Sequence, residues 1–579
     1  MAKTFLATTA LEEFWDDRLP ILFLEEWCLL HRRRHVWNAL EHRLLPPSWS
    51  NQGELGRART YLQELYEDVL VRLSAALGNI HARSRSSRYW RILLGPWLYA
   101  YLCMMHERYG SLRRALDMEH ELTTIGLDSA CFVTPTDTNE FIEWLKDDAY
   151  NLQIYTRLWQ AMGMNFPVKP LAENRRPISE PVTHSSESVP GKFLRLILGG
   201  SRKIVLYSSY FPLEFQIRLA IQTAGKVIPI RSGQKTPSTQ NIDHPTRRTL
   251  ASALPTNNSF EMAVARLFAA DIPRCFLEDF ATIADAARRY FPRSPKAILS
   301  ASWLYNEPFK LWAAEAQELG TSLLCSQHGG IYGLLNYVPY ENHELAIADR
   351  FYSWGWTSDV FHEKIVPLPG GKLMGRKTFG ANKRRRGILW AATQAPRYPV
   401  FPFGDRFSEY LAWQARFLAA FPVELRNELR LRLHREDGGW DILQRLSDQG
   451  FTVQTEDWSR PFYRSLSECR LYVCDHLSTT FIEALSADKP TVLFWSAQAT
   501  PLRPEAIPYC ENLKSVGILF ETPEKAAAAI RAGYDDVEDW WRDPHRQEVR
   551  RSFCFKFGRT SIKAEAEWAQ ELIRWEKKL

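Results

Sequence analysis

Hydrophobic positions recur with helical spacing over most of the first 165 residues. The clearest examples are GELGRARTYLQELYEDVLVRLSAALG and NEFIEWLKDDAYNLQIYTRLWQAMG, which contain few β-branched runs. The pattern predicts an α-helical N-terminal domain over residues 1–165. The next stretch, VKPLAENRRPISEPVTHSSESVPGK, is rich in proline, serine and charge and has no hydrophobic period, so we expect a linker over residues 166–192.

From Lys192 onward, short apolar runs alternate with helical patterns. The runs form two series: first RKIVLYSSY, KVIPIRSG, KAILSASW, TSLLCSQHGG and ELAIADRFYSWGW, then ILWAATQ, LRLRLHRED, FTVQTED, RLYVCDH and KPTVLFWS. Strands alternating with helices indicate right-handed crossovers and parallel sheets. The predicted fold class is therefore α/β, with two Rossmann-type domains over residues 193–375 and 376–545. Residues 546–579 are expected to form C-terminal helices that cross back over the junction.

Composition and charge narrow the class of protein. The 579-residue chain is 45% hydrophobic and 24% charged, which is typical of globular domains. Its net charge of +6 is small for this length; we expect no nucleic-acid partner, although a mildly basic face suits an anionic ligand or peripheral contact with the inner face of a membrane.

Cysteine usage and the start of the chain bear on its compartment. The nine cysteines are scattered without a C-x-x-C pair, which argues against a disulfide framework and a zinc site. No signal peptide is readable at the start, and no run reaches the ~18 apolar residues of a membrane span. We expect a cytoplasmic protein.

The most informative segment is CDHLSTTFIEALSADKPTVLFW, residues 474–495. An apolar strand ends at Asp475 and His476, and a hydroxyl cluster opens a helix. The cluster consists of Ser478, Thr479 and Thr480. In open α/β sheets ligands bind beyond the carboxyl ends of strands, and a helix N-terminus attracts anions, so this is a candidate phosphate site. Glu483, one turn further, is placed for ribose hydroxyls; the alternative is an ordinary N-cap with a structural glutamate.

Polar residues also follow three other predicted strands. Thr393 and Gln394 follow ILWAA, and His434 follows LRLRL. After TSLLCSQ come His328, Gly329 and Gly330. Glycines allow close backbone approach to a ligand, and a histidine can act as acid, base or phosphate partner. The open alternatives are a surface histidine at 434 and a buried histidine capping a tight turn at 328.

Candidates for a general base or a covalent nucleophile are the acids Glu307, Asp349 and Asp475, besides His328. Asp349 has the alternative role of capping the next element. No Asp-x-Asp follows a predicted strand, so we expect no metal site. Helix N-termini, hydroxyls and histidines would then stabilise the charge of the leaving group.

A polar set near the N-terminus has two interpretations. Glu26, Arg33 and Arg34 could form a site for a sugar or acceptor carboxylate, because guanidinium groups pair bidentately with carboxylates. The alternative is an intrahelical array of ion pairs.

One region of the sequence resembles the donor-nucleotide region of GT-B glycosyltransferases. It consists of an apolar strand followed, over residues 478–494, by S-T-T-x-x-E-A-L and then K-P-T-V-L-F. It is most similar to the branch with CMP-Kdo and sialic-acid-type transferases and CDP-glycerol polymerases. The resemblance implies that the hydroxyl cluster binds donor phosphate, that Glu483 approaches the ribose and that His434 contacts phosphate. Arg435 stands where that branch commonly has proline, so the match there is partial. By this resemblance residues 193–375 are the acceptor side and residues 376–545 bind the nucleotide.

Several further motifs resemble a largely uncharacterised family of surface-carbohydrate transferases. They are Q-H-G-G-x-Y-G at 327–333, E-W-C at 26–28, R-R-H-V-W at 33–37 and G-P-W-L at 95–98, so the resemblance spans nearly the whole chain. It supports the class of enzyme and leaves the sugar open.

The resemblance implies a metal-independent glycosyltransferase. We expect it to move a CMP-activated Kdo or nonulosonic-type sugar onto a surface glycan or glycoprotein acceptor, with no cofactor besides the nucleotide-sugar donor. Alternatives on the same fold are a UDP-sugar transferase, a CDP-alditol polymerase and a nucleotide-sugar epimerase. A non-catalytic scaffold is the alternative from another class.

Overall fold

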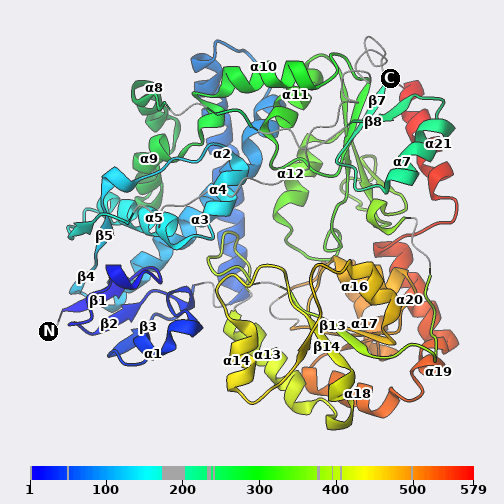
Figure 1. Cartoon of the computed structure of the whole chain (residues 1–579). Coiled ribbons are helices and arrows are strands. Elements are labelled where there is room, and N and C mark those ends of the chain that lie inside the picture. Colours follow the sequence, from blue (N-terminus) through cyan, green and yellow to red (C-terminus); the bar gives the residue numbers. More distant parts are fainter. Residues whose placement is uncertain are drawn as a thin grey trace.

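The computed structural model describes residues 3–48, 51–172, 203–230, 236–238, 241–374, 378–393, 395–404, 407–496 and 500–578. Two parallel six-stranded sheets and a helical N-terminal region make up this part of the chain. Figure 1 shows the N-terminal region beside both sheets, with the first sheet at the top right and the second at the bottom right. The predicted class, a pair of Rossmann-type domains with a helical N-terminal region, is confirmed.

The N-terminal region is built on two long helices, α2 (Gln52–Ile80) and α3 (Ser87–Met118). Asn51 accepts a hydrogen bond from the Glu54 backbone N–H at 2.9 Å and so caps α2. Helix α3 is buried on nearly every face from Tyr89 to Met105, which explains why its sequence is apolar all round. The short helices α1 (Arg34–Trp37), α4 (Thr138–Trp144) and α5 (Asp148–Ala161) complete this region.

The N-terminal region also contains strands that the helical pattern did not predict. They form a parallel sheet of order β3-β2-β1-β4 and a two-stranded pair β5-β6. Their bounds are β1 Thr4–Ala7, β2 Ile21–Phe23, β3 His42–Leu44, β4 Leu122–Thr123, β5 Gly126–Leu127 and β6 Val168–Lys169. Each strand has at most four residues, too few for an alternating pattern to stand out.

The first large sheet has the order β8-β7-β9-β10-β11-β12. In chain order this is 2-1-3-4-5-6, which extends the flavodoxin-like order by one strand and places a topological switch point between β7 and β9. Its strands are β7 Ile204–Tyr207, β8 Val227–Pro229, β9 Ala297–Ser300, β10 Ser322–Ser326, β11 Arg350–Ser353 and β12 Ile365–Pro367. Its helices are α7 Leu213–Gln222, α10 Phe280–Tyr290, α11 Glu307–Glu318 and α12 Pro339–Ile347. The chain between β8 and β9 also forms α8 His244–Thr249 and α9 Ser259–Asp271, which lie with the N-terminal region, where α9 packs against α5 and α3.

The second large sheet has the order β15-β14-β13-β16-β17-β18. In chain order this is 3-2-1-4-5-6, the order of dinucleotide-binding Rossmann folds, with the switch point between β13 and β16. Its strands are β13 Ile388–Ala391, β14 Leu429–Arg432, β15 Gln454–Thr455, β16 Leu471–Cys474, β17 Thr491–Phe494 and β18 Leu519–Phe520. Its helices are α13 Phe407–Ala420, α14 Ile442–Asp448, α15 Phe462–Glu468, α16 Thr479–Ser486, α17 Ile507–Ser515 and α18 Pro523–Gly533.

Both sheets are covered on both faces. On β16, Leu471 and Val473 belong to one apolar core while Tyr472 and Cys474 belong to another, as strand alternation requires. The second of these cores is continuous with the interior of the N-terminal region.

The C-terminal helices are α19 (Val537–Arg542), α20 (Pro544–Phe557) and α21 (Ala564–Lys578). Helix α20 packs against α16 and α17 of the second sheet, and α21 returns to the first sheet, where it packs against α7. Trp568 of α21 is buried against Phe211 and Tyr352, with ring centroids 4.9 Å apart in each case. Figure 1 shows α21 in red beside α7.

Helix α11 contains a buried ion pair whose two side chains form hydrogen bonds with the N-terminal region. Glu307 and Lys310 lie 2.9 Å apart, with side chains 3% and 0% exposed. Lys310 also donates to the Leu93 carbonyl at 3.0 Å and to Thr138 Oγ1 at 3.2 Å. Glu307 therefore has a structural role in a buried ion pair, and the interpretation of this acid as a catalytic group is wrong.

We predict that Glu307→Gln lowers the free energy of unfolding by about 3–5 kcal/mol, because the Lys310 ammonium is left buried without its carboxylate. The midpoint of urea unfolding measures this change. Glu524→Gln is the matched control, since its pair with Arg416 is nearly half exposed and contributes less than about 1 kcal/mol. Equal effects of the two substitutions would contradict the structural role of Glu307.

Candidate active site between the two sheets

The carboxyl ends of the two sheets meet where the backbone of a loop from the first sheet contacts a helix terminus of the second. The loop after β10 carries Gly329 and Gly330, and the Gly330 N–H donates to Thr479 Oγ1 of α16 at 3.1 Å. A Cβ added at Gly330 would lie 2.7 Å from the Ser478 carbonyl oxygen and 2.9 Å from Thr479 Cα. Only glycine fits this approach, so the glycine pair and the hydroxyl cluster predicted from the sequence lie together.

A second contact fixes the same junction. Leu335 pairs with Leu502 in an isolated antiparallel bridge, and the Asn336 N–H donates to the Pro501 carbonyl at 3.1 Å. Arg503 forms an ion pair with buried Glu341 of α12 and donates to the Leu335 carbonyl at 2.8 Å. These contacts hold the segment after His328 against the second sheet.

The hydroxyl cluster begins α16 as expected. Ser478 is the N-cap and accepts from the Thr480 N–H at 3.2 Å, and the two hydroxyl oxygens lie 2.8 Å apart. All three hydroxyl residues are partly exposed. Glu483 is buried and lies 3.4 Å from Lys372, whose side chain is 41% exposed. The helix N-terminus thus offers N–H groups and hydroxyls, with a lysine nearby, to an anionic group.

Asp475 is a structural anchor. Its carboxylate, 4% exposed, accepts hydrogen bonds from four side chains: Trp390 Nε1 at 3.1 Å, Tyr410 Oη at 2.8 Å, Gln414 Nε2 at 3.1 Å and His476 Nδ1 at 2.8 Å. A carboxylate that accepts from four donors has no lone pair left to serve as a base or nucleophile. The interpretation of Asp475 as catalytic is therefore wrong.

His476 carries the positive charge of this cluster. Burial works against its charged form, but the neighbouring Cys474 and the Asp475 carboxylate outweigh burial and raise the pKa of His476 to about 10. At neutral pH the ring is therefore cationic, two residues before the N-cap of α16.

His328 is paired with a carboxylate that the sequence did not reveal. Glu344 of α12 is fully buried, and its Oε1 lies 3.5 Å from His328 Nδ1. The Tyr332 hydroxyl lies 3.3 Å from the same nitrogen. The His328 side chain is 28% exposed. A partly exposed imidazole next to a buried carboxylate is an arrangement suited to a general base, because the carboxylate stabilises the imidazolium.

The loop after β7 has a strained backbone beside His328. Ser208 and Tyr210 have φ values of 44° and 58°, which side chains other than glycine rarely adopt. The Tyr210 ring, 53% exposed, lies 6.3 Å from the His328 ring between centroids. Such strain clusters at functional sites, and this loop follows the switch-point strand of the first sheet.

Two further candidates lie at the carboxyl edge of the second sheet. Thr393 follows β13, and its N–H donates to the Tyr410 hydroxyl at 2.9 Å. His434 follows β14 and is exposed, with its ring 5.5 Å from Trp458. In the sheet, β13 lies between β14, which His434 follows, and β16, which leads to the hydroxyl cluster. Gln394 lies outside the described residues.

Asp349 lies at the wrong edge of the sheet for catalysis. It precedes β11, pairs with Arg88 at 2.9 Å and accepts from the Leu323 N–H at 2.7 Å. The start of a parallel strand is opposite to the ligand edge, so the interpretation of Asp349 as catalytic is wrong and its alternative role, closing the start of an element, holds.

Glu26, Arg33 and Arg34 do not form a common carboxylate site. Arg33 pairs with Glu12 at 2.6 Å, Arg34 pairs with Asp448 of α14 at 2.9 Å, and Glu26 accepts from the Ser408 N–H at 3.2 Å. The two guanidinium groups already have intramolecular carboxylates, so the predicted site is wrong. The partners are distant in sequence, so the array is not intrahelical either; it ties the N-terminal region to the second sheet.

Sequence reasoning missed Glu344, Tyr332 and Lys372. Tyr332 lies inside the Q-H-G-G-x-Y-G motif, which could have drawn attention to it. Glu344 and Lys372 stand in segments without any motif, so only the folding of α12 and of the loop after β12 brings them to the site.

Within the described ranges, no group of three or more His, Cys, Asp or Glu side chains is arranged to hold a metal ion. None of the helices in those ranges is both long and apolar enough to cross a bilayer.

The sheet orders and the site between the carboxyl ends define a two-domain Rossmann-type α/β enzyme. A family model, described as the LIC12162 family transferase, matches residues 4–572, and the chain belongs to this family. The predicted enzyme class, a transferase, is thereby confirmed. No protein of curated function matches the sequence.

Several solved structures share the general arrangement at low similarity. HepE of Anabaena, in complex with UDP and glucose, is 11% identical over 66% of this chain and 100% of its own, with a TM-score of 0.36. The O-GlcNAc transferase of Thermobaculum terrenum is 14% identical over 90% and 98%, with a TM-score of 0.33. The UDP-GlcNAc 2-epimerase of Neisseria meningitidis is 10% identical over 65% and 100%, with a TM-score of 0.34. These likenesses are too distant to assign a donor or an acceptor.

We predict that Gly330→Ala lowers kcat/KM by about 10²-fold, because its Cβ displaces the Ser478–Thr479 backbone and small misplacements are costly in an active site. Steady-state kinetics, with the melting temperature as a check on folding, measures the change. Gly329→Ala is the matched control: its Cβ would make ordinary contacts with Thr479 Oγ1 at 3.7 Å and Tyr332 Cε2 at 3.9 Å, and activity should stay close to wild type. Wild-type activity of Gly330→Ala would show that the contact does not matter for catalysis.

Proposed function

We propose that this transferase is a metal-independent glycosyltransferase that uses a nucleotide-activated sugar. The observation that carries the proposal is the N-terminus of α16, with its hydroxyl cluster, lying against the glycine pair that follows His328. An anion-binding helix terminus and a histidine with a buried carboxylate therefore meet at the carboxyl edges of two Rossmann-type sheets.

In this mechanism His328 is the general base. Its Nε2 takes the proton of the acceptor hydroxyl while that oxygen bonds to the anomeric carbon and the bond from that carbon to the donor phosphate breaks. Glu344 holds Nδ1–H and stabilises the imidazolium that forms. The N–H groups and hydroxyls of α16 stabilise the charge on the departing nucleotide.

For the donor we propose a CMP-linked acidic sugar of the Kdo or nonulosonic type, with a surface glycan or glycoprotein as acceptor. The S-T-T-x-x-E-A-L resemblance supports the nucleotide. The N–H groups and hydroxyls at the start of α16 support a donor that carries negative charge. All nine cysteines are buried and free, which suits a reducing compartment and hence the cytoplasm.

The nucleotide preference is testable by thermal shift. We expect CMP to raise the melting temperature more than CDP, UDP, GDP or ADP, equally with and without magnesium, because a ligand that binds only the native state stabilises it. Ser478→Ala and Glu483→Ala should lose this response. A selective response to UDP or CDP would replace the CMP-sugar proposal with a UDP-sugar enzyme or a CDP-alditol polymerase, and no response to any nucleotide would favour a non-catalytic scaffold.

The role of the histidine pair is testable by kinetics with the donor identified in that way. His328→Ala should lower kcat by about 10²–10⁴-fold, as expected for a lost general base. Glu344→Gln should lower kcat by about 10²-fold or more with little change in the donor KM, because it acts on His328 and not on the nucleotide. If Glu344→Gln instead raises KM and leaves kcat unchanged, Glu344 contributes to substrate binding. The proposal that His328 and Glu344 form a catalytic pair would then be wrong.

A further inference from the structure

The loop after β7 keeps a backbone conformation that its own residues disfavour. The φ values of 44° at Ser208 and 58° at Tyr210 lie in the left-handed region, which costs free energy in any residue with a Cβ. Contacts on both sides hold the loop in place. The Ala301 N–H, after β9, donates to the Ser208 carbonyl at 3.2 Å, and Phe211 is buried against Trp568 with ring centroids 4.9 Å apart. The surrounding structure therefore imposes the strain.

Tyr210 gains little packing in return for this strain. Its side chain is 53% exposed, whereas the next residue, Phe211, is buried. At a φ of 58° a glycine would fit without cost, and a large aromatic residue is among the least favoured. The stability of the fold thus gives no reason for a tyrosine at this position, and a role in binding does.

The exposed ring of Tyr210 lies beside the candidate base. The ring centroids of Tyr210 and His328 are 6.3 Å apart, with the ring planes inclined by 33°. Burial and the negative charge of Glu344 raise the pKa of Tyr210, so its hydroxyl stays protonated at neutral pH and can both donate and accept. Strand β9 lies between β7 and β10, and partly exposed Tyr305 follows it. Two tyrosines and His328 therefore follow three adjacent strands at the ligand edge of the first sheet.

This set of side chains matches the chemistry of a sugar ring. A pyranose has an apolar face of C–H groups that packs on an aromatic ring, and its hydroxyl groups pair with neutral donors and acceptors such as a phenol. A sugar that lies on the exposed ring of Tyr210 extends its hydroxyl groups toward His328, because the two side-chain rings are close together. The accessible aromatic surface at this edge thus fits a neutral carbohydrate.

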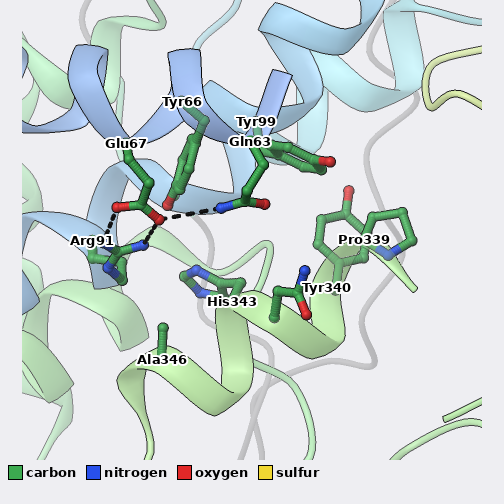
Figure 2. Close-up of a pocket in the computed structure, with 11 residues that line it drawn as sticks. Gln63, Tyr66, Glu67, Arg91, Tyr99, Pro339, Tyr340, His343 and Ala346 are labelled. Atoms are coloured by element: carbon green, nitrogen blue, oxygen red, sulfur yellow. Dashed lines mark hydrogen bonds and ion pairs between the residues drawn. The ribbon is translucent and has the colours of Figure 1, made fainter. Parts of the chain in front are cut away.

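The pocket between α12, α2 and α3, which Figure 2 shows, does not offer such a surface. Its cavity volume is about 50 Å³, far below the ~300–1,000 Å³ of pockets that hold small molecules. Tyr66 and His343 in its wall are buried. A sugar ring is therefore better accommodated at the exposed edge beside Tyr210.

We propose that Tyr210 is a binding residue for the acceptor. Its ring stacks on the apolar face of a neutral pyranose and so positions one hydroxyl group of that sugar at Nε2 of His328. This role rests on the proposed function, because the sugar held by Tyr210 is the acceptor of the glycosyl group. The strained loop fixes the ring beside the base before the acceptor binds, which lowers the entropy cost of binding.

Saturation-transfer NMR on the full chain without nucleotide tests this role, with the methyl glycosides of glucose, galactose and N-acetylglucosamine as probes. We expect at least one glycoside to bind the wild type. Tyr210→Phe keeps the stacking face and should bind that glycoside about as well. Tyr210→Gly removes the ring and should bind it roughly tenfold more weakly.

Tyr290→Gly is the matched control. Tyr290 is 51% exposed, ends α10 and precedes β9, so it lies toward the amino edge of the same sheet. This variant should bind the glycoside like the wild type. Its melting temperature should fall more than that of Tyr210→Gly, because only the substitution at Tyr210 relieves a positive φ while it removes a half-exposed ring.

Four results would overturn the proposal. They are no binding of any glycoside to the wild type, equal binding by Tyr210→Gly and Tyr290→Gly, loss of binding in Tyr210→Phe, and a melting temperature of Tyr210→Gly as low as that of Tyr290→Gly. The last result would show that the tyrosine serves packing. Since no nucleotide is present, failure here leaves the nucleotide response of the candidate active site as a separate result.

Discussion

The approach of the Gly330 backbone to Ser478 and Thr479 governs the geometry of the site. Two sheets joined by loops could adopt many relative positions, but a glycine N–H bonded to a hydroxyl of the opposite helix terminus leaves little freedom. The bridge between Leu335 and Leu502 and the pair of Arg503 with Glu341 reinforce the same junction. As a result, His328 and the start of α16 are held at the same edge. A substrate whose anionic group contacts the helix terminus would there lie close to the histidine.

The ion pairs and hydrogen bonds of the candidate acids distinguish those with a structural role from the one placed to assist His328. Asp475 accepts from four donors, Glu307 is paired with Lys310, and Asp349 is paired with Arg88. Glu344 differs, because its buried carboxylate has no hydrogen bond of good geometry and lies nearest to the partly exposed His328. Burial without full pairing stabilises a neighbouring positive charge, which is what a general base requires once it has taken a proton.

The N-terminal region packs against the domains of both sheets. It contacts the first sheet through α11 and α12, and it contacts the second through Arg34 and Asp448. Its polar residues therefore have partners far away in sequence, which explains why Glu26, Arg33 and Arg34 looked like a binding site when only local spacing was considered.

The sequence by itself determined the fold class, the first five strands of each large sheet and the helix N-terminus at Ser478; it missed the last strand of each, β12 and β18. These features depend on local hydrophobic period and on residues adjacent along the chain, such as an apolar run followed by S-T-T. The short N-terminal strands were missed because two to four residues carry too little pattern. Which acid serves His328 was decided only by the tertiary structure. Glu307, Asp349 and Asp475 follow or precede predicted strands and look alike in sequence, whereas Glu344 has no local signal. Their burial, their partners and the edge of the sheet on which they lie depend on contacts between residues distant in the chain, and those contacts exist only after α12 has packed between the first sheet and α3.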